Sequence, residues 1–130
     1  MSIWFGLWVG GKEIEHISTA LWMEEENKAL EAIFPDDEYW NIGTPREYDF
    51  IANEAKAKKA MQDYLDRMKN YKGKPFHITS NLETRNDIHI ASPTEIYATA
   101  NGFVKEFMKV YDIGMVSQRE GKEVKVEIAT

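Results

Sequence analysis

The stretch that decides the fold class is residues 3–17, which read IWFGLWVGGKEIEHI. Its first part, residues 3–9, is rich in the aromatic and branched side chains that strands favour, and the glycine pair at 10–11 is a tight-turn signal. Residues 12–17 then alternate between polar and apolar side chains, as a strand with one buried face does. The stretch therefore predicts a β-hairpin.

Three helices are expected further along the chain. The first spans residues 19–34, where apolar residues recur at helical spacing before Pro35 stops the helix. Two later stretches, TPRE at 44–47 and SPTE at 92–95, share one start signal. In each, a hydroxyl residue caps the helix, proline fills its first position and glutamate completes a capping box. These signals predict long helices that run to about Tyr71 and Tyr111.

The remaining segments predict further hairpins. Residues 76–80 and 87–91 are expected to pair between the two long helices, and IGMVSQ at 113–118 is expected to pair with KEVKVEIA at 122–129. Gly102, inside the last helix, predicts a close approach by another element, because glycine costs a helix about 1 kcal/mol relative to alanine.

Hairpin-length pairs of strands, rather than strict alternation of strand and helix, favour an α+β fold. We expect an antiparallel or mixed sheet with two long helices and one shorter helix packed on one face. The chain has 130 residues with no repeat or linker-like stretch, which predicts one domain over residues 1–130. Terminal hairpins are common dimerisation elements, so a homodimer is one expected assembly.

Composition excludes several classes of protein. The hydrophobic fraction of 43% is typical of a globular chain, and the absence of cysteine excludes thiol nucleophiles and cysteine-ligated metals. The N-terminal stretch lacks the pattern of a signal peptide, and no apolar run approaches the roughly 20 residues that span a membrane. We expect a cytoplasmic protein that has no membrane contact and no cofactor.

Negative charge is concentrated in residues 24–38. Seven acids and one lysine lie there, so 1 minus 7 accounts for the whole net charge of −6. Such a patch attracts basic partners and repels duplex nucleic acid. Aromatic side chains beside it resemble the anchors of protein interfaces, although aromatic residues also fill cores and charge runs often only solubilise a helix. The expected partner-binding residues are Glu24, Glu25, Asp36, Asp37, Glu38, Tyr39, Trp40 and Tyr48.

Positive charge is concentrated in residues 53–74, which hold seven basic and three acidic residues. A basic helix attracts phosphates, so an alternative ligand is a small phosphorylated nucleotide. Lys58 and Arg85 are the expected phosphate-binding residues.

Two histidines lie in similar settings in FHITSNLETRNDIHIAS, residues 76–92. If His77 pairs opposite His89, both imidazoles and Thr79 share one face of the hairpin, and the isoleucines face the core. Two imidazoles could then act as general base and general acid on a phosphodiester, or could bind zinc with Asp87 or His16. The alternative is that these residues form the solvent face of a half-exposed hairpin.

The H-x-T element at residues 77–79 resembles those of the two-histidine phosphodiesterases, which would imply a phosphodiesterase or nuclease. The second copy, HIA at 89–91, lacks the hydroxyl, and both copies lie in one hairpin rather than in separate halves of the chain. Phosphate-binding glycine loops, HExxH and GxSxG are absent from the sequence. The leading hypothesis is therefore a non-enzymatic binding protein that inhibits or sequesters a partner, of the immunity-protein or phage anti-defence type. A phosphodiesterase is the alternative.

Overall fold

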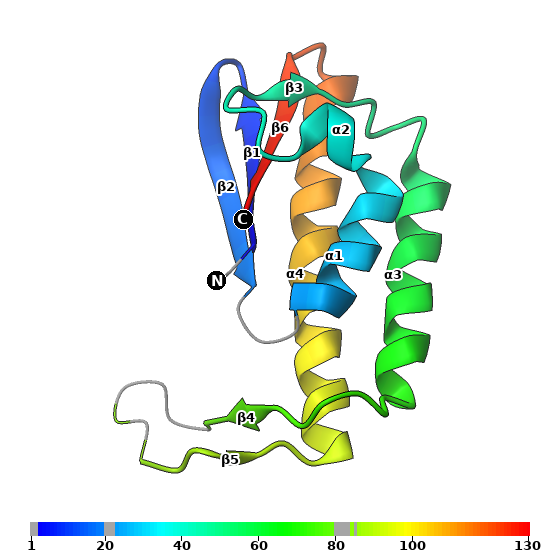
Figure 1. Ribbon diagram of the computed structural model, residues 1–130. Coiled ribbons are helices and arrows are strands. Elements are labelled where there is room, and N and C mark those ends of the chain that lie inside the picture. Colours follow the sequence, from blue (N-terminus) through cyan, green and yellow to red (C-terminus); the bar gives the residue numbers. More distant parts are fainter. Residues whose placement is uncertain (1–2, 20–22, 80–83, 85) are drawn as a thin grey trace.

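A four-stranded sheet with helices against one face forms the body of the protein (Figure 1). The computed structural model describes residues 3–19, 23–79, 84 and 86–130. Its elements are β1 (Ile3–Val9), β2 (Lys12–Thr19), α1 (Met23–Ile33), α2 (Asp36–Tyr39), β3 (Arg46–Glu47), α3 (Glu54–Lys69), β4 (His77–Ile78), β5 (His89–Ile90), α4 (Pro93–Arg119) and β6 (Val124–Ala129). The named strands pair antiparallel, which confirms the α+β class.

The sheet has the strand order β2-β1-β6-β3. β1 and β2 form the predicted hairpin, and Gly10 and Gly11 take positive φ angles of 61° and 83° in its turn, a conformation that glycine adopts without strain. β6 lies between β1 and β3, although it comes from the other end of the chain. Trp40 adds a parallel bridge to Ile128 of the same strand.

The predicted hairpin between residues 113–118 and 122–129 is wrong. Residues 113–118 belong to α4, whose buried stripe continues from Phe107 through Tyr111 to Met115 at helical spacing. β6 consequently pairs with β1, from the N-terminal part of the sequence, rather than with residues 113–118, which lie shortly before it in the sequence. Of the described helices, none has the length and apolar character needed to cross a membrane.

The two matching start signals have different outcomes. SPTE begins α4 as predicted: Ser92 Oγ accepts from Glu95 N at 3.2 Å, and Glu95 Oε1 accepts from Ser92 N at 2.9 Å. TPRE does not begin a helix, since residues 46–47 form β3 against β6 and α3 starts only at Glu54. The sheet edge therefore outweighs the local helix signal at residues 44–47.

Gln118 of α4 holds the extended segment that follows β3. Its Nε2 donates to Tyr48 O at 2.8 Å, and its Oε1 accepts from Phe50 N at 2.8 Å and from Ile51 N at 3.2 Å. These bonds occupy backbone groups that a helix would have used internally. The segment leads into the core, where the Phe50 ring is fully buried.

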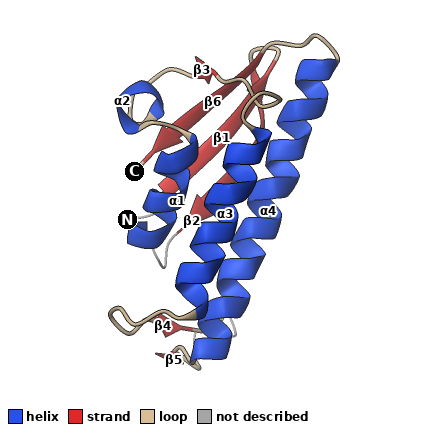
Figure 2. Cartoon of the chain, turned by 90° about the vertical axis from the view of Figure 1, so that its right-hand side faces the viewer, coloured by secondary structure: helices blue, strands red, loops and turns tan. Residues whose placement is uncertain are grey.

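Helices α1, α3 and α4 lie together on the core side of the sheet, and the β4–β5 hairpin stands near the N-terminal end of α4 (Figure 2). α1 confirms the first predicted helix over residues 23–33, while residues 20–22 lie outside the described part. The predicted close approach at Gly102 is wrong, because Gly102 is exposed and a Cβ there would meet nothing within 4 Å. The close approach occurs at Gly114, against Phe50.

Candidate functional site

The histidine hairpin forms with a register different from the predicted one. His77 pairs with Ile90 and Ile78 pairs with His89, one residue away from the expected pairing. A slip of one residue moves a side chain to the other face of a strand, so the two imidazoles lie on opposite faces. Ile88 and Ile90 are consequently 59% and 61% exposed instead of facing the core.

His89 is held by two acceptors. Its Nδ1 lies 2.6 Å from Asp87 O, and its Nε2 lies 2.7 Å from Glu95 Oε2. The backbone oxygen of Asp87 and then the Glu95 carboxylate raise the pKa of His89, because both accept from the protonated ring. The Ser92 backbone amide and His89 lower the pKa of Glu95 in turn. His89 thus joins the hairpin to the capping box of α4.

The predicted placement of both imidazoles on one face of the hairpin is not observed. His77 is exposed on the other face of the hairpin from His89, and Thr79 donates to the carboxylate of Asp87. Within the described residues, no group of three or more histidine and acidic side chains is placed to hold a metal ion. The role that the structure gives His89 is to attach the hairpin to α4.

Of the two expected phosphate-binding residues, the described part of the chain contains Lys58. Lys58 lies on α3, where its Nζ is 3.3 Å from Glu54 Oε2, and it is exposed. Arg85 lies outside the described residues. A site for a phosphorylated ligand therefore stays a prediction.

The acidic segment divides into a paired part and an unpaired part. On α1, Glu25 is held by Arg67 of α3 at 3.0 Å and by Lys28 at 3.3 Å, and Glu24 is exposed beside it. On α2, the side chains of Asp36, Asp37 and Glu38 are all exposed. Across residues 3–19, 23–79, 84 and 86–130, these three carboxylates form no ion pair.

The aromatic residues beside α2 fix the helix in place. Tyr39 Oη donates to Glu47 O of β3 at 2.9 Å, and the buried Trp40 donates through Nε1 to Phe34 O at 3.0 Å. Tyr48 is 4% exposed and packs against Phe34, with ring centroids 4.5 Å apart. Burial raises the pKa of the Tyr48 hydroxyl, and Tyr111 adds to this effect. Trp40 and Tyr48 are therefore parts of the core rather than exposed anchors.

Asn41 ties the end of α2 to the central strand. Its backbone N–H donates to Ile128 O at 2.8 Å, and its side-chain Oδ1 accepts from Thr130 N at 3.0 Å. Asn41 adopts a φ of 53°, a left-handed conformation that asparagine tolerates better than most residues. Asn41 thus attaches the end of α2 to the backbone of Ile128 and Thr130.

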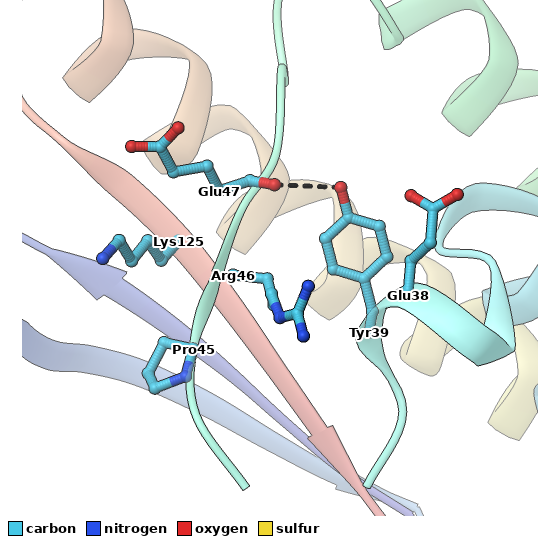
Figure 3. A pocket seen from close by; sticks show the side chains of 6 residues that line it. All are labelled: Glu38, Tyr39, Pro45, Arg46, Glu47 and Lys125. Carbon is cyan, nitrogen blue, oxygen red and sulfur yellow. Dashed lines mark hydrogen bonds between the residues drawn. The ribbon is translucent and has the colours of Figure 1, made fainter. Parts of the chain in front are cut away.

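A shallow depression of about 450 Å³ lies between α2 and β3 (Figure 3). Glu38 and Tyr39 are on its α2 wall. The other lining residues are Pro45, which precedes β3, Arg46 and Glu47 of β3, and Lys125 of β6. Arg46 also opposes the rise in the pKa of Tyr39 that burial and Glu38 cause. Sequence reasoning missed Arg46, because TPRE was interpreted as a helix start. It missed Lys125 because β6 was expected in a separate terminal hairpin.

The comparisons with known proteins add no relative. No protein-family model matches the chain, and neither a curated protein nor a solved structure gives a significant match.

Proposed function

We propose that this is a non-enzymatic binding protein whose α2 face engages a basic surface of a protein partner and blocks it. An immunity protein that neutralises a toxin, or a phage inhibitor of a defence nuclease, works in this way. The observation that supports the proposal is the set of three consecutive exposed carboxylates, Asp36, Asp37 and Glu38, that have no ion pair in the described residues.

Preorganisation favours this reading over a merely solubilising role. The α2 turn is held by Tyr39 Oη on Glu47 O, by Trp40 Nε1 on Phe34 O and by Asn41 N on Ile128 O. A binding surface that is already rigid loses less conformational entropy when a partner docks. Exposed carboxylates also speed the encounter with a basic partner through long-range attraction. Tyr39 thus supports binding by holding the charges in position.

The histidine hairpin does not favour the enzymatic alternative. Its two imidazoles lie on opposite faces, and both nitrogens of His89 already have acceptors. General acid–base catalysis needs both groups within reach of one substrate.

A cytoplasmic setting and a homodimer complete the proposal. The absence of cysteine fits a reducing compartment. β2 is an edge strand of the sheet, whereas β6 is internal, so the β1–β2 hairpin is the terminal element that a second copy could use. Light scattering after gel filtration measures this directly, and a monomer at all concentrations would remove the dimer from the proposal.

The test is a comparative affinity capture with three forms of the protein. Wild type, an α2 variant (Asp36→Lys, Asp37→Lys, Glu38→Lys) and a control variant (Asp63→Lys, Glu106→Lys, Asp112→Lys) are immobilised and exposed to lysate of the native host. The two variants carry the same change in net charge, and the control positions are exposed on α3 and α4. Quantitative mass spectrometry should find a basic protein retained by wild type and control but lost from the α2 variant.

Equal retention by all three forms, or no protein specifically retained by wild type, would contradict the proposal. Tyr39→Phe provides a finer test, because it removes the hydrogen bond to Glu47 O without changing charge. We expect this variant to retain the partner less well than wild type and better than the α2 variant.

A further inference from the structure

The second face of the four-stranded sheet is open among the described residues. Helices α1 and α4 lie against the face that carries Ile3, Phe5 and Leu7, which are at most 2% exposed (Figure 1). Side chains alternate across a strand, so Trp4, Gly6 and Trp8 point to the opposite face. Both tryptophans are partly exposed there.

Trp4 lies flat on this open face. A Cβ built on Gly6 would be 2.6 Å from Trp4 Cη2, which places the six-membered ring directly over Gly6. The neighbours of Gly6 on the adjacent strands are His16 and Glu127, and directly opposite residues share a face. The indole therefore extends between these two side chains, and its ring lies 6.4 Å from that of His16 with an angle of 27° between the planes.

Of the two ionisable side chains opposite Gly6, Glu127 is the one available to a cationic ligand. His16 Nδ1 lies 3.4 Å from Glu13 Oε1, whereas Glu127 has no ion pair within the described part of the chain. The residues that pair with Trp4 itself are Ser18 and Ala129, which are small and uncharged. A ring with small neighbours and an available carboxylate suits a cation, because the face of an indole is the most electron-rich that a side chain offers.

Trp8 has different charged neighbours from Trp4. It pairs with Lys125 of β6, whose Nζ lies 3.5 Å from Glu123 Oε1, and with Glu13 of β2, whose Oε1 lies 3.4 Å from His16 Nδ1. An incoming cation over Trp8 would meet the positive charge of Lys125, and the carboxylates of Glu13 and Glu123 nearby already have ion-pair partners, whereas Glu127 has none among the described residues. Trp4 is therefore the more favourable of the two positions.

We propose that Trp4 and Glu127 form a site for an arginine side chain on the partner protein. The planar guanidinium stacks on the indole, and its N–H groups donate to the Glu127 carboxylate. Lysine fits less well, since a compact ammonium cannot stack and donate in parallel pairs. The inference deepens the proposed function, because it rests on a basic partner and names a second surface that contacts it.

The test is a titration of ¹⁵N-labelled protein with the peptide acetyl-Gly-Arg-Gly-amide, followed through the indole N–H signals in NMR spectra. We expect a saturable shift of the Trp4 signal that is larger than that of Trp8. The same peptide with citrulline in place of arginine keeps the shape and removes the charge, and it should give no saturable shift. An unmoved Trp4 signal, or equal shifts with both peptides, would overturn the proposal.

Two variants identify the residues responsible. Glu127→Gln should weaken arginine binding by roughly two- to five-fold, as expected for one exposed ion pair, whereas Glu123→Gln should leave it unchanged. Trp4→Leu should abolish the effect of arginine on the remaining signals; since it could also disturb the sheet, Glu127→Gln is the decisive variant. Unchanged binding in Glu127→Gln would overturn the assignment.

The titration and the affinity capture fail independently. The α2 variant with Asp36, Asp37 and Glu38 replaced by lysine should still show the Trp4 shift, because it leaves Trp4 and Glu127 unchanged. A lost capture with an intact titration would count against the α2 face alone. A failed titration with an intact capture would count against the Trp4 site alone.

Discussion

Gly114 of α4 faces the ring of Phe50 so closely that a Cβ would come within 2.8 Å of Cδ2 and Cε2. Both residues are buried, and Tyr111 Oη also donates to Phe50 O at 2.7 Å. Gly114→Ala should therefore overpack the core and lower the free energy of unfolding by about 1–3 kcal/mol. Denaturant titration followed by circular dichroism measures this change.

Gly102→Ala is the matched control in the same helix. A Cβ at Gly102 would meet nothing within 4 Å, and the residue is exposed. The substitution should stabilise the protein by up to about 1 kcal/mol, because alanine favours the helix more than glycine does. Equal effects of the two substitutions would refute the close packing of α4 against Phe50.

Gln118 is expected to be the most sensitive polar residue of α4. Gln118→Leu removes its three hydrogen bonds to the backbone of residues 48–51 and leaves the part-buried amide of Phe50 without its acceptor. An unsatisfied amide of this kind costs about 1–3 kcal/mol. Gln62→Ala, which removes an exposed i,i+4 contact with Asp66, should change the free energy of unfolding by less than about 0.5 kcal/mol. A similar loss of unfolding free energy in both variants would contradict the role of Gln118 in holding residues 48–51.

The two TPRE-like stretches should respond differently to loss of their hydroxyl. Ser92→Ala removes an observed N-cap and should destabilise the protein by about 1 kcal/mol. Thr44→Ala removes an exposed hydroxyl that caps no helix, so its effect should stay within about 0.5 kcal/mol. Thermal unfolding of the two variants beside wild type distinguishes them. A loss of stability in Thr44→Ala as large as that in Ser92→Ala would indicate that Thr44 caps a helix after all.

The His89–Glu95 contact predicts a pH dependence of known sign. The pKa of His89 is raised from 6.5 in the folded state by Asp87 O and Glu95, so the protonated ring stabilises the fold. That stabilisation is fully present below about pH 6.5 and is lost as the pH rises through the raised pKa. The free energy difference between wild type and His89→Gln should therefore shrink as the pH rises above about 6.5 and through the raised pKa of His89.

An NMR titration of the His89 ring gives an independent check. Glu95→Gln removes the carboxylate that accepts from Nε2 at 2.7 Å, so it should lower the pKa of His89 toward its ordinary value. A pKa of His89 that is the same in wild type and Glu95→Gln would show that the contact does not form in solution.

The sequence predicted those elements whose signals are local. The β1–β2 hairpin, α1 and the capping box of α4 follow from glycine, proline and side-chain spacing within a few residues. The failures occur where distant contacts decide: residues 46–47 pair with β6 from the other end of the chain, and Gln118 holds the segment after them. For the candidate site, the acids of α2 were predicted as binding residues, but the burial of Trp40 and Tyr48 was not predicted. In the sequence alone, an aromatic residue that fills the core cannot be distinguished from one that is exposed to bind a partner.

The position of β6 has a consequence for how the chain acquires its structure during synthesis. This strand follows every other described element along the sequence, yet it lies between β1 and β3 and supplies a partner to each. While the ribosome still holds residues 124–129, β1 has β2 as its neighbour and one edge stays unpaired. Exposed edges of this kind favour pairing with other chains. A nascent chain halted at residue 119 should therefore be more easily cut by protease than one extended through residue 130, because only the longer chain can add β6 to the sheet.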